Sequence, residues 1–323
     1  YFISDQLDIK KEKLEIASSI CKSDLVSGLV GEFPELQGIM GKYFAANQGF
    51  DEEVSRAVSE HYLPISISST VPKKPISYGL SIIDKLDTLV GFFLINEKPT
   101  SSKDPFALRR SAIGLLRTII ENNLTVGLRD LIDYLIRFYT EQGVKDVNKN
   151  THLELINFFR DRMKNILKEK RVRPDIIEAS LSSHTNDNFL ELYKKTLVMN
   201  KFISKDLGKN AVSTYKRAYN IIDREKNISK SGPDAVLFKQ DEEKELFDKI
   251  NDIRKAFTYK ERKESYENHL KLLSDAKLST DKFFDNVKVN DENNDIKNNR
   301  LELLQRLCST FNTFIDFSKL EGN

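Results

Sequence analysis

The chain has 323 residues, which is enough for two domains or for one large domain with an appendage. Its 51 basic and 49 acidic residues nearly balance, so net charge alone indicates no particular partner. No apolar run approaches the ~18 residues that a membrane span needs, and no signal peptide is visible, so we expect no membrane association and a cytoplasmic location. Cys21 and Cys308 stand in no metal-binding or redox spacing, which fits a reduced compartment. Because the first residue is Tyr1 rather than methionine, we interpret the chain as a fragment.

Apolar residues recur at helical spacing over long stretches, and only 13 glycines and 8 prolines interrupt them, which predicts an all-α fold. In the first half we expect one or two helices over 8–30, short pieces over 31–43, and further helices near 51–61, 77–94, 105–122, 128–139, 151–170 and 174–181. Asp104 and Pro105 have the chemistry of an N-cap and a first helical residue. The polar stretch 182–188 is the predicted boundary. Beyond it we expect helices near 189–197, 204–223, 241–258, 259–273 and 296–317.

Positive charge is concentrated in two stretches. Residues 160–173 hold seven basic and two acidic side chains, and residues 194–230 hold ten basic and three acidic ones. Either stretch alone is most simply a solvated helix face. Two such stretches close together, with tyrosines interleaved in the second, favour a surface that binds nucleic acid.

Several strings of residues resemble one family, in the family's order, over nearly the whole chain. The most specific are EFPELQG at 32–38 and KDPFALRR at 103–110. The others are KSDL at 22–25, EHYLP at 60–64, DKLDTLVGFF at 84–93, RPDIIEA at 173–179, YKRAYNI at 215–221, FFDNV at 283–287 and NRLELL at 299–304. On these strings the chain resembles the C-terminal part of the β subunit of bacterial heterotetrameric glycyl-tRNA synthetase.

The resemblance implies a helical HD-like domain at 1–140, a helical connector at 141–185 and a C-terminal helical-bundle anticodon-binding domain at 186–323, similar to that of arginyl-tRNA synthetase. It implies glycine tRNA and the α subunit of an α2β2 enzyme as partners. The α subunit would activate glycine with ATP and magnesium, which leaves this chain as a non-catalytic part of the ligase with no cofactor of its own. The sequence itself shows no adenylate-forming signature and no phosphate-cradling glycine-rich run.

The HD-like positions are incomplete. An HD phosphohydrolase gathers histidines and aspartates around one or two metals to activate water. The resemblance puts Asp24 and Asp84 at two such positions, but Ser23 precedes Asp24, and His61 is the only histidine before residue 152. Two aspartates and one histidine make a poor ligand set, so we expect no metal. A metal-dependent phosphohydrolase and a helical protein-interaction scaffold remain the alternative functions.

Two neighbouring predicted helices carry charges inside their apolar faces or along the rim of them. On a helical wheel Asp87 falls inside the apolar arc of 77–94, and Arg109 inside that of 105–122. An unpaired buried charge is costly, so we predict that Asp87 and Arg109 form a structural ion pair. Arg110 and Arg117 lie along the rim and are candidates for binding tRNA phosphate, with intramolecular pairing as the alternative.

The candidates for reading the anticodon lie within two turns of the helix predicted at 204–223. Unpaired RNA bases are recognised by aromatic stacking and by polar groups on base edges. We therefore expect Tyr215 to stack, Arg217 or Asn220 to contact base edges and Lys216 to contact phosphate. The alternative makes Tyr219 and Ile222 of the same helix core residues and Lys216 plain solvated surface. Arg300 on the last helix is a further tRNA-binding candidate.

Overall fold

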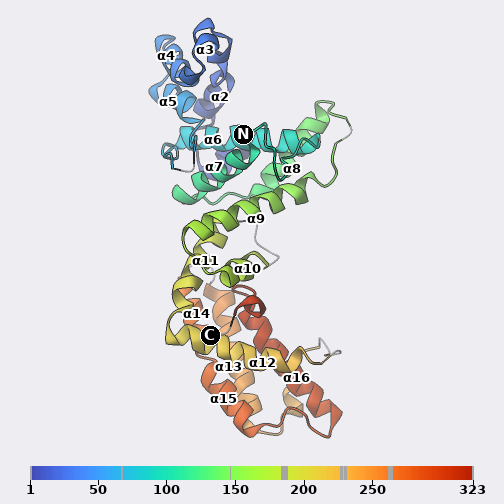
Figure 1. The fold of residues 1–323 in the computed structure, drawn as a ribbon. Coiled ribbons are helices and arrows are strands. Elements are labelled where there is room, and N and C mark those ends of the chain that lie inside the picture. The colour runs from blue at the N-terminus through green and yellow to red at the C-terminus, as the bar shows by residue number, and fades with distance from the viewer. Residues whose placement is uncertain are drawn as a thin grey trace. The chain divides into compact units, whose positions relative to one another are not determined.

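The computed structural model describes residues 2–66, 68–145, 147–182, 188–225, 228, 231–260 and 265–321. In these residues every regular element is a helix and there is no strand, which confirms the predicted all-α class. The helices form two compact units (Figure 1). One unit contains the chain up to Glu169 and the start of α11 up to Tyr193, and the other contains α10, the rest of α11 and the chain that follows. No helix of the described residues is both long and apolar enough to cross a membrane.

The first unit is built around α6. Its helices and short 3-10 turns are α1 (Phe2–Leu7), α2 (Lys11–Ile20), η1 (Ser23–Val26), α3 (Gly28–Glu32), η2 (Pro34–Leu36), α4 (Ile39–Asn47), α5 (Glu52–Glu60), α6 (Pro75–Leu94), α7 (Leu108–Glu121), α8 (Leu128–Glu141) and α9 (Thr151–Glu169). Helix α6 packs against α2, α5, α7, α8 and α9. Its side chains Leu80, Ile82, Leu86, Leu89 and Val90 are at most 2% exposed, as the apolar periodicity of this segment requires.

Helix α7 begins later than the sequence predicts. Asp104 does cap it, since its carboxylate accepts hydrogen bonds from the backbone N–H groups of Leu108 at 2.8 Å and Arg109 at 3.0 Å. However, Ala107 has the left-handed φ of 53°, so residues 105–107 form a turn and the helix starts at Leu108. The predicted start at residue 105 is therefore wrong by one turn. The Asp104 carboxylate caps N–H groups four and five residues further on, so the helix begins after the intervening turn.

The second unit surrounds α12. Its elements are α10 (Pro174–Ser182), α11 (Phe189–Ile203) from Lys194 on, α12 (Asp206–Ile222), η3 (Ala235–Leu237), α13 (Asp241–Lys260), α14 (Tyr266–Ser274), α15 (Lys277–Asn286), α16 (Asn294–Phe311) and η4 (Phe317–Lys319). Helix α12 packs against α14, α15 and α16. A Cβ atom at Gly208 would collide with the Phe202 carbonyl oxygen, so glycine allows α12 to start directly against the end of α11.

Candidate nucleic-acid interface

One face of α12 is polar, basic and open. Lys209, Ser213, Lys216 and Asn220 are spaced by four, three and four residues, which places them in one row along the helix. All four line a cavity of about 630 Å³. Among the described residues no side-chain partner occupies Lys216 or Asn220, so the ammonium and the amide are available to an incoming ligand.

Arg217 borders the same cavity and is held in place by its neighbours. Its guanidinium lies 3.5 Å from a carboxylate oxygen of Asp281 and 3.6 Å from one of Asp285. It also lies 4.5 Å from the centre of the Phe284 ring, in cation–π contact. With 47% of the side chain exposed, the guanidinium is oriented while part of it remains accessible.

Tyr215 does not belong to this face, contrary to our expectation. The residue is only 1% exposed, and its ring lies 5.6 Å from that of Phe317 and 5.9 Å from that of Phe311. Its hydroxyl accepts a hydrogen bond from Asn312 at 3.2 Å, and burial raises the pKa of Tyr215 well above its usual value. A ring inside the core cannot stack on an RNA base, so Tyr215 is a core residue.

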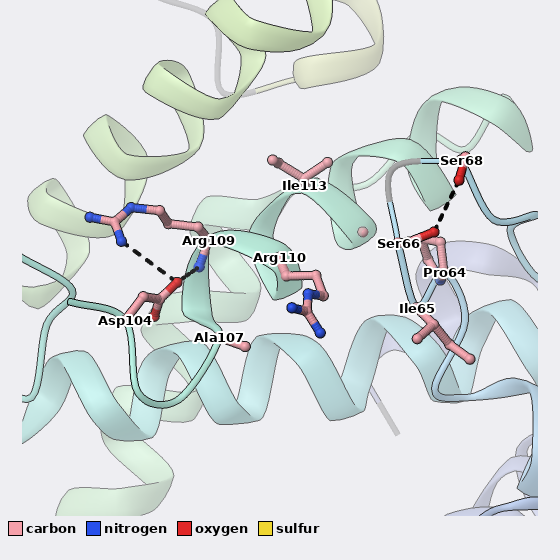
Figure 2. Close-up of a pocket in the computed structure, with 10 residues that line it drawn as sticks. Pro64, Ile65, Ser66, Ser68, Asp104, Ala107, Arg109, Arg110 and Ile113 are labelled. Carbon is pink, nitrogen blue, oxygen red and sulfur yellow. Dashed lines mark hydrogen bonds and ion pairs between the residues drawn. The ribbon is translucent and has the colours of Figure 1, made fainter. Parts of the chain in front are cut away.

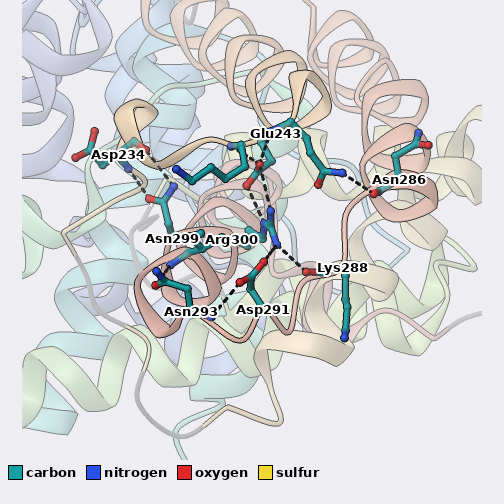
Figure 3. A network of polar contacts seen from close by, with 11 residues as sticks. Asp234, Glu243, Asn286, Lys288, Asp291, Asn293, Asn299 and Arg300 are labelled. Carbon is teal, nitrogen blue, oxygen red and sulfur yellow. Dashed lines mark hydrogen bonds and ion pairs between the residues drawn. The ribbon is translucent and has the colours of Figure 1, made fainter.

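Arg300 is likewise internal rather than available to tRNA (Figure 3). Its side chain is 4% exposed, and its Nε donates to Glu243, which is fully buried, at 2.9 Å. A second nitrogen donates to Asp291 at 2.8 Å and to the Lys288 carbonyl at 2.9 Å. The Glu243 carboxylate also accepts the backbone N–H groups of Lys239 and Gln240. The predicted tRNA contact at Arg300 is therefore wrong, because all of this bonding is directed into the fold.

The predicted ion pair between Asp87 and Arg109 is also absent from the described structure. Asp87 accepts a hydrogen bond from the Tyr139 hydroxyl of α8 at 2.8 Å. Arg109 bonds the Thr100 carbonyl and lies 3.8 Å from the Asp104 carboxylate that caps its own helix. Each charge is satisfied by a nearer partner, and both side chains are only half-buried, so nothing forces them together.

The two rim arginines of α7 have different environments. Arg117 donates to the Ser66 carbonyl at 3.2 Å and to the Ser69 carbonyl at 2.9 Å, and pairs with Glu121 at 2.8 Å. These bonds support the intramolecular alternative for Arg117. Arg110 is exposed and has no side-chain partner among the described residues, so it is the arginine of this pair that is available to a phosphate.

At one of the two positions that resemble an HD site, Asp84, a lysine ammonium lies between the carboxylate and His61 instead of an open ligand set. Lys22 Nζ lies 2.8 Å from Asp84 Oδ1 and 3.1 Å from His61 Nε2. Since an ammonium can only donate, Nε2 accepts, and His61 Nδ1–H donates to the Val58 carbonyl at 2.7 Å. Burial, together with the nearby charge of Lys22, lowers the pKa of His61 to about 4.

Asp24 is turned toward the backbone in the same cluster. Its Oδ2 accepts hydrogen bonds from the N–H groups of Gly38 at 2.6 Å and Gly41 at 3.1 Å. Gly38 has the left-handed φ of 78°, which favours glycine and lets its N–H reach the buried carboxylate. Among the described residues, no three His, Cys, Asp or Glu side chains are placed to hold a metal ion.

Reasoning from the sequence missed two features of these sites. Lys209 and Ser213 extend the α12 row by two turns, and their spacing from Lys216 was a sufficient signal. The role of Lys22 had no such signal, because its partners His61 and Asp84 lie 39 and 62 positions away in the sequence. Only the packing of η1, α5 and α6 brings the three together.

Comparison with known families first defines the class of the second unit. Residues 211–318 match the family model described as DALR anticodon binding domain. This segment begins two residues after Lys209 and contains Ser213, Lys216 and Asn220. The chain therefore carries an anticodon-binding domain that includes three of the four residues of the open α12 row.

Residues 2–182 match the family model described as glycyl-tRNA synthetase beta subunit, and the chain belongs to that family. It is 38% identical over 316 residues to the glycine–tRNA ligase beta subunit of Rhodospirillum centenum, covering 96% of this chain and 44% of the relative. It is 40% identical over 304 residues to that of Rickettsia africae, covering 94% and 44%. With that of Rickettsia typhi the identity is 38% over 321 residues, covering 99% and 46%. These matches confirm the resemblance, and the chain spans less than half the length of these relatives.

Proposed function

We propose that this chain is the tRNA-binding part of a glycine–tRNA ligase β subunit and that its second unit recognises the anticodon of glycine tRNA. The observation that carries the proposal is the open row Lys209, Ser213, Lys216 and Asn220, of which all but Lys209 lie inside the matched anticodon-binding domain. Ammonium groups bind phosphate, and a side-chain amide has both a donor and an acceptor for a base edge. Arg217, held by its two carboxylates and Phe284, is a second group oriented for a base edge.

We propose that the chemistry of aminoacylation lies outside this chain, in an α subunit that uses ATP and magnesium, and that this chain holds no cofactor and works in the cytoplasm. The first unit supports the absence of hydrolase chemistry. A divalent ion between His61 and Asp84 would have to displace the Lys22 ammonium. One carboxylate oxygen of Asp24 already accepts hydrogen bonds from two backbone N–H groups. A metal-dependent phosphohydrolase is therefore the weaker candidate.

An apolar surface on the first unit supports a protein partner, which we propose is the α subunit of an α2β2 enzyme. Eight of the 18 exposed large apolar side chains among the described residues fall between residues 25 and 50, which is less than a tenth of the chain. That segment has three charged side chains, too few for an RNA surface. The eight are Leu25, Val26, Leu29, Phe33, Ile39, Tyr43, Phe44 and Phe50. Val26→Asp, at a residue 91% exposed, should abolish co-elution of the chain with the α subunit.

The tRNA-binding proposal is tested by the salt dependence of affinity. Lys216→Ala should weaken binding of glycine tRNA and reduce the slope of log K against log salt by about 0.7–0.9, as loss of one phosphate contact requires. Lys244→Ala removes the same charge from an exposed position on α13 and serves as the control. Equal effects of the two variants, or no measurable binding of tRNA by the unaltered chain, would reject the proposal.

A further inference from the structure

The first unit has a cavity of about 860 Å³ beside α7 (Figure 2). Its walls are mainly apolar and come from the loop after α5 and from the first turns of α7. The lining residues are Pro64, Ile65, Ser66, Ser68, Asp104, Ala107, Arg109, Arg110, Ile113 and Gly114. The volume lies in the range of about 300–1,000 Å³ that is usual for pockets of small ligands.

Three backbone carbonyl groups on the loop side of this cavity are held before any ligand arrives. Arg117 holds the carbonyl groups of Ser66 and Ser69. Lys85, buried in α6, donates to the Leu63 carbonyl at 2.8 Å. A cavity held open by such bonds costs a ligand little ordering free energy on binding.

Arg110 is an exposed charged residue of the lining that has no side-chain partner among the described residues. Its side chain lies between Ala107 and Ile65 in Figure 2, and it lines both this cavity and an adjoining one of about 380 Å³. The other charges of the large cavity cancel, since Asp104 lies against Arg109 and accepts two backbone N–H groups. Within the lining of the large cavity, the charge that is left without a carboxylate partner is therefore one guanidinium, which favours an anion, and phosphate in particular.

We propose that this cavity binds a single unpaired nucleotide of the tRNA, with the base against Pro64, Ile65 and Ile113 and the phosphate on Arg110. The inference rests on the proposed function, because it takes tRNA as the source of the nucleotide. An apolar slot suits the face of an unstacked base, and a guanidinium beside it can bind the phosphate bidentately. The hydroxyls of Ser66 and Ser68, which lie 3.3 Å apart and bond to each other, also line the cavity and can hydrogen-bond a base edge or a ribose.

Cross-linking of the full chain to glycine tRNA tests the assignment directly. A transcript with 4-thiouridine in place of uridine is irradiated in the complex, and the attached peptides are mapped by mass spectrometry. We expect cross-links within 64–68 or 107–113 in addition to those on α12. Ser68→Trp fills the cavity from an exposed position, so it should remove the first set and leave the α12 set unchanged.

Affinity measurements provide the second readout. Arg110→Ala should raise the Kd for glycine tRNA about tenfold, the loss expected for one charge-assisted phosphate contact. Arg137→Ala is the matched control, because Arg137 is an exposed arginine of the same unit that lines neither cavity. An unchanged Kd for Arg110→Ala would overturn the assignment.

Three outcomes of the cross-linking would also overturn the assignment of the cavity. They differ in whether the proposed tRNA-binding function is rejected with it. Cross-links on α12 alone would remove the nucleotide pocket and leave the proposed function standing. Cross-links on neither unit would remove both. Displacement of the 64–68 and 107–113 cross-links by micromolar adenosine monophosphate would assign the cavity to a free nucleotide instead of tRNA.

Discussion

Lys22 shows how one side chain can change the chemistry of a whole cluster. Its ammonium lies between His61 and Asp84 and also stands 4.3 Å from the centre of the Tyr62 ring. The chain itself thus supplies a positive charge among the side chains of His61, Tyr62 and Asp84. The histidine is kept neutral, with its Nδ1–H on the Val58 carbonyl.

Replacing Lys22 should therefore change the titration of His61. In Lys22→Met the nearby positive charge is lost and the Asp84 carboxylate is left beside the ring, so the pKa of His61 should rise from about 4 toward its ordinary 6.5. The measurement is the pH dependence of the His61 ring resonances by NMR. Lys42→Met, at an exposed position on α4, is the control. A pKa unmoved by Lys22→Met would show that burial alone sets it.

The same histidine predicts how stability depends on pH. The folded pKa of about 4 lies below the ordinary 6.5, so between these values the unfolded chain binds more protons than the folded one. Its contribution, at most about 3 kcal/mol, is therefore present above pH 6.5 and is lost as pH falls toward 4. Urea unfolding at pH 7, 5.5 and 4.5 measures this loss. His61→Gln should flatten the dependence, and an identical pH profile in that variant would contradict the assignment.

Helices α13 and α16 are joined through the buried pair of Glu243 and Arg300. Removing one partner leaves the other charge buried, so Arg300→Met should lower the free energy of unfolding by roughly 3–5 kcal/mol. Arg217→Met is the matched comparison, because it removes an arginine whose carboxylate partners are half-buried Asp281 and exposed Asp285, and should cost less than about 1 kcal/mol. Denaturant unfolding distinguishes them. Similar losses in both variants would mean that the internal pair is not the stronger one.

The start of α7 depends on Asp104. Asp104→Ala removes the acceptor for the N–H groups of Leu108 and Arg109 and should cost about 1 kcal/mol of stability. Asp104→Asn keeps one acceptor oxygen and should lose about half as much. Thermal unfolding of the three proteins tests this order, and an asparagine variant less stable than the alanine variant would contradict it.

The sequence predicted the positions of the helices better than it predicted the interaction partners of their side chains. Periodicity located most helices, because an apolar stripe is a local property: α9 was predicted at 151–170 and is Thr151–Glu169. A helical wheel predicts the direction in which a side chain points, but not which residue of another helix lies opposite it. The partner of Asp87 is the hydroxyl of Tyr139, 52 residues further along the chain, and not the predicted Arg109. Arg300 similarly pairs with Glu243, 57 residues earlier in the chain, and no local pattern in the sequence predicts this pairing.

The candidate site followed the same rule. Lys216, Arg217 and Asn220 were predicted together on a single helix, and all three line the same cavity. Tyr215 was misplaced although it sits among them, since a step of about 100° per residue turns it into the core. Composition does not decide which face of an amphipathic helix a tyrosine belongs to, because the ring is compatible with both.

At the scale of the whole molecule, the two units carry different surfaces for the same proposed ligand. The second unit has the α12 row within the anticodon-binding domain, and the first unit has the apolar cavity with Arg110. Variants of Arg217 or Asn220 on α12 should respond to the identity of the anticodon. Arg110→Ala should weaken binding whatever the anticodon, because its phosphate lies elsewhere on the tRNA.

The most direct test of the account is a double-mutant cycle between α12 and the anticodon. Kd values are measured for the unaltered chain, Asn220→Ala and Arg217→Ala, each with glycine tRNA and with transcripts in which one anticodon base is replaced. We predict that one of the two variants loses about 1–3 kcal/mol with the normal anticodon, by analogy with base contacts on DNA, and little with the transcript that already lacks the contacted base. Lys216→Ala, a phosphate contact, should weaken all transcripts alike. Additivity within about 0.5 kcal/mol for both Asn220 and Arg217 at every anticodon position would contradict the claim that α12 reads the anticodon.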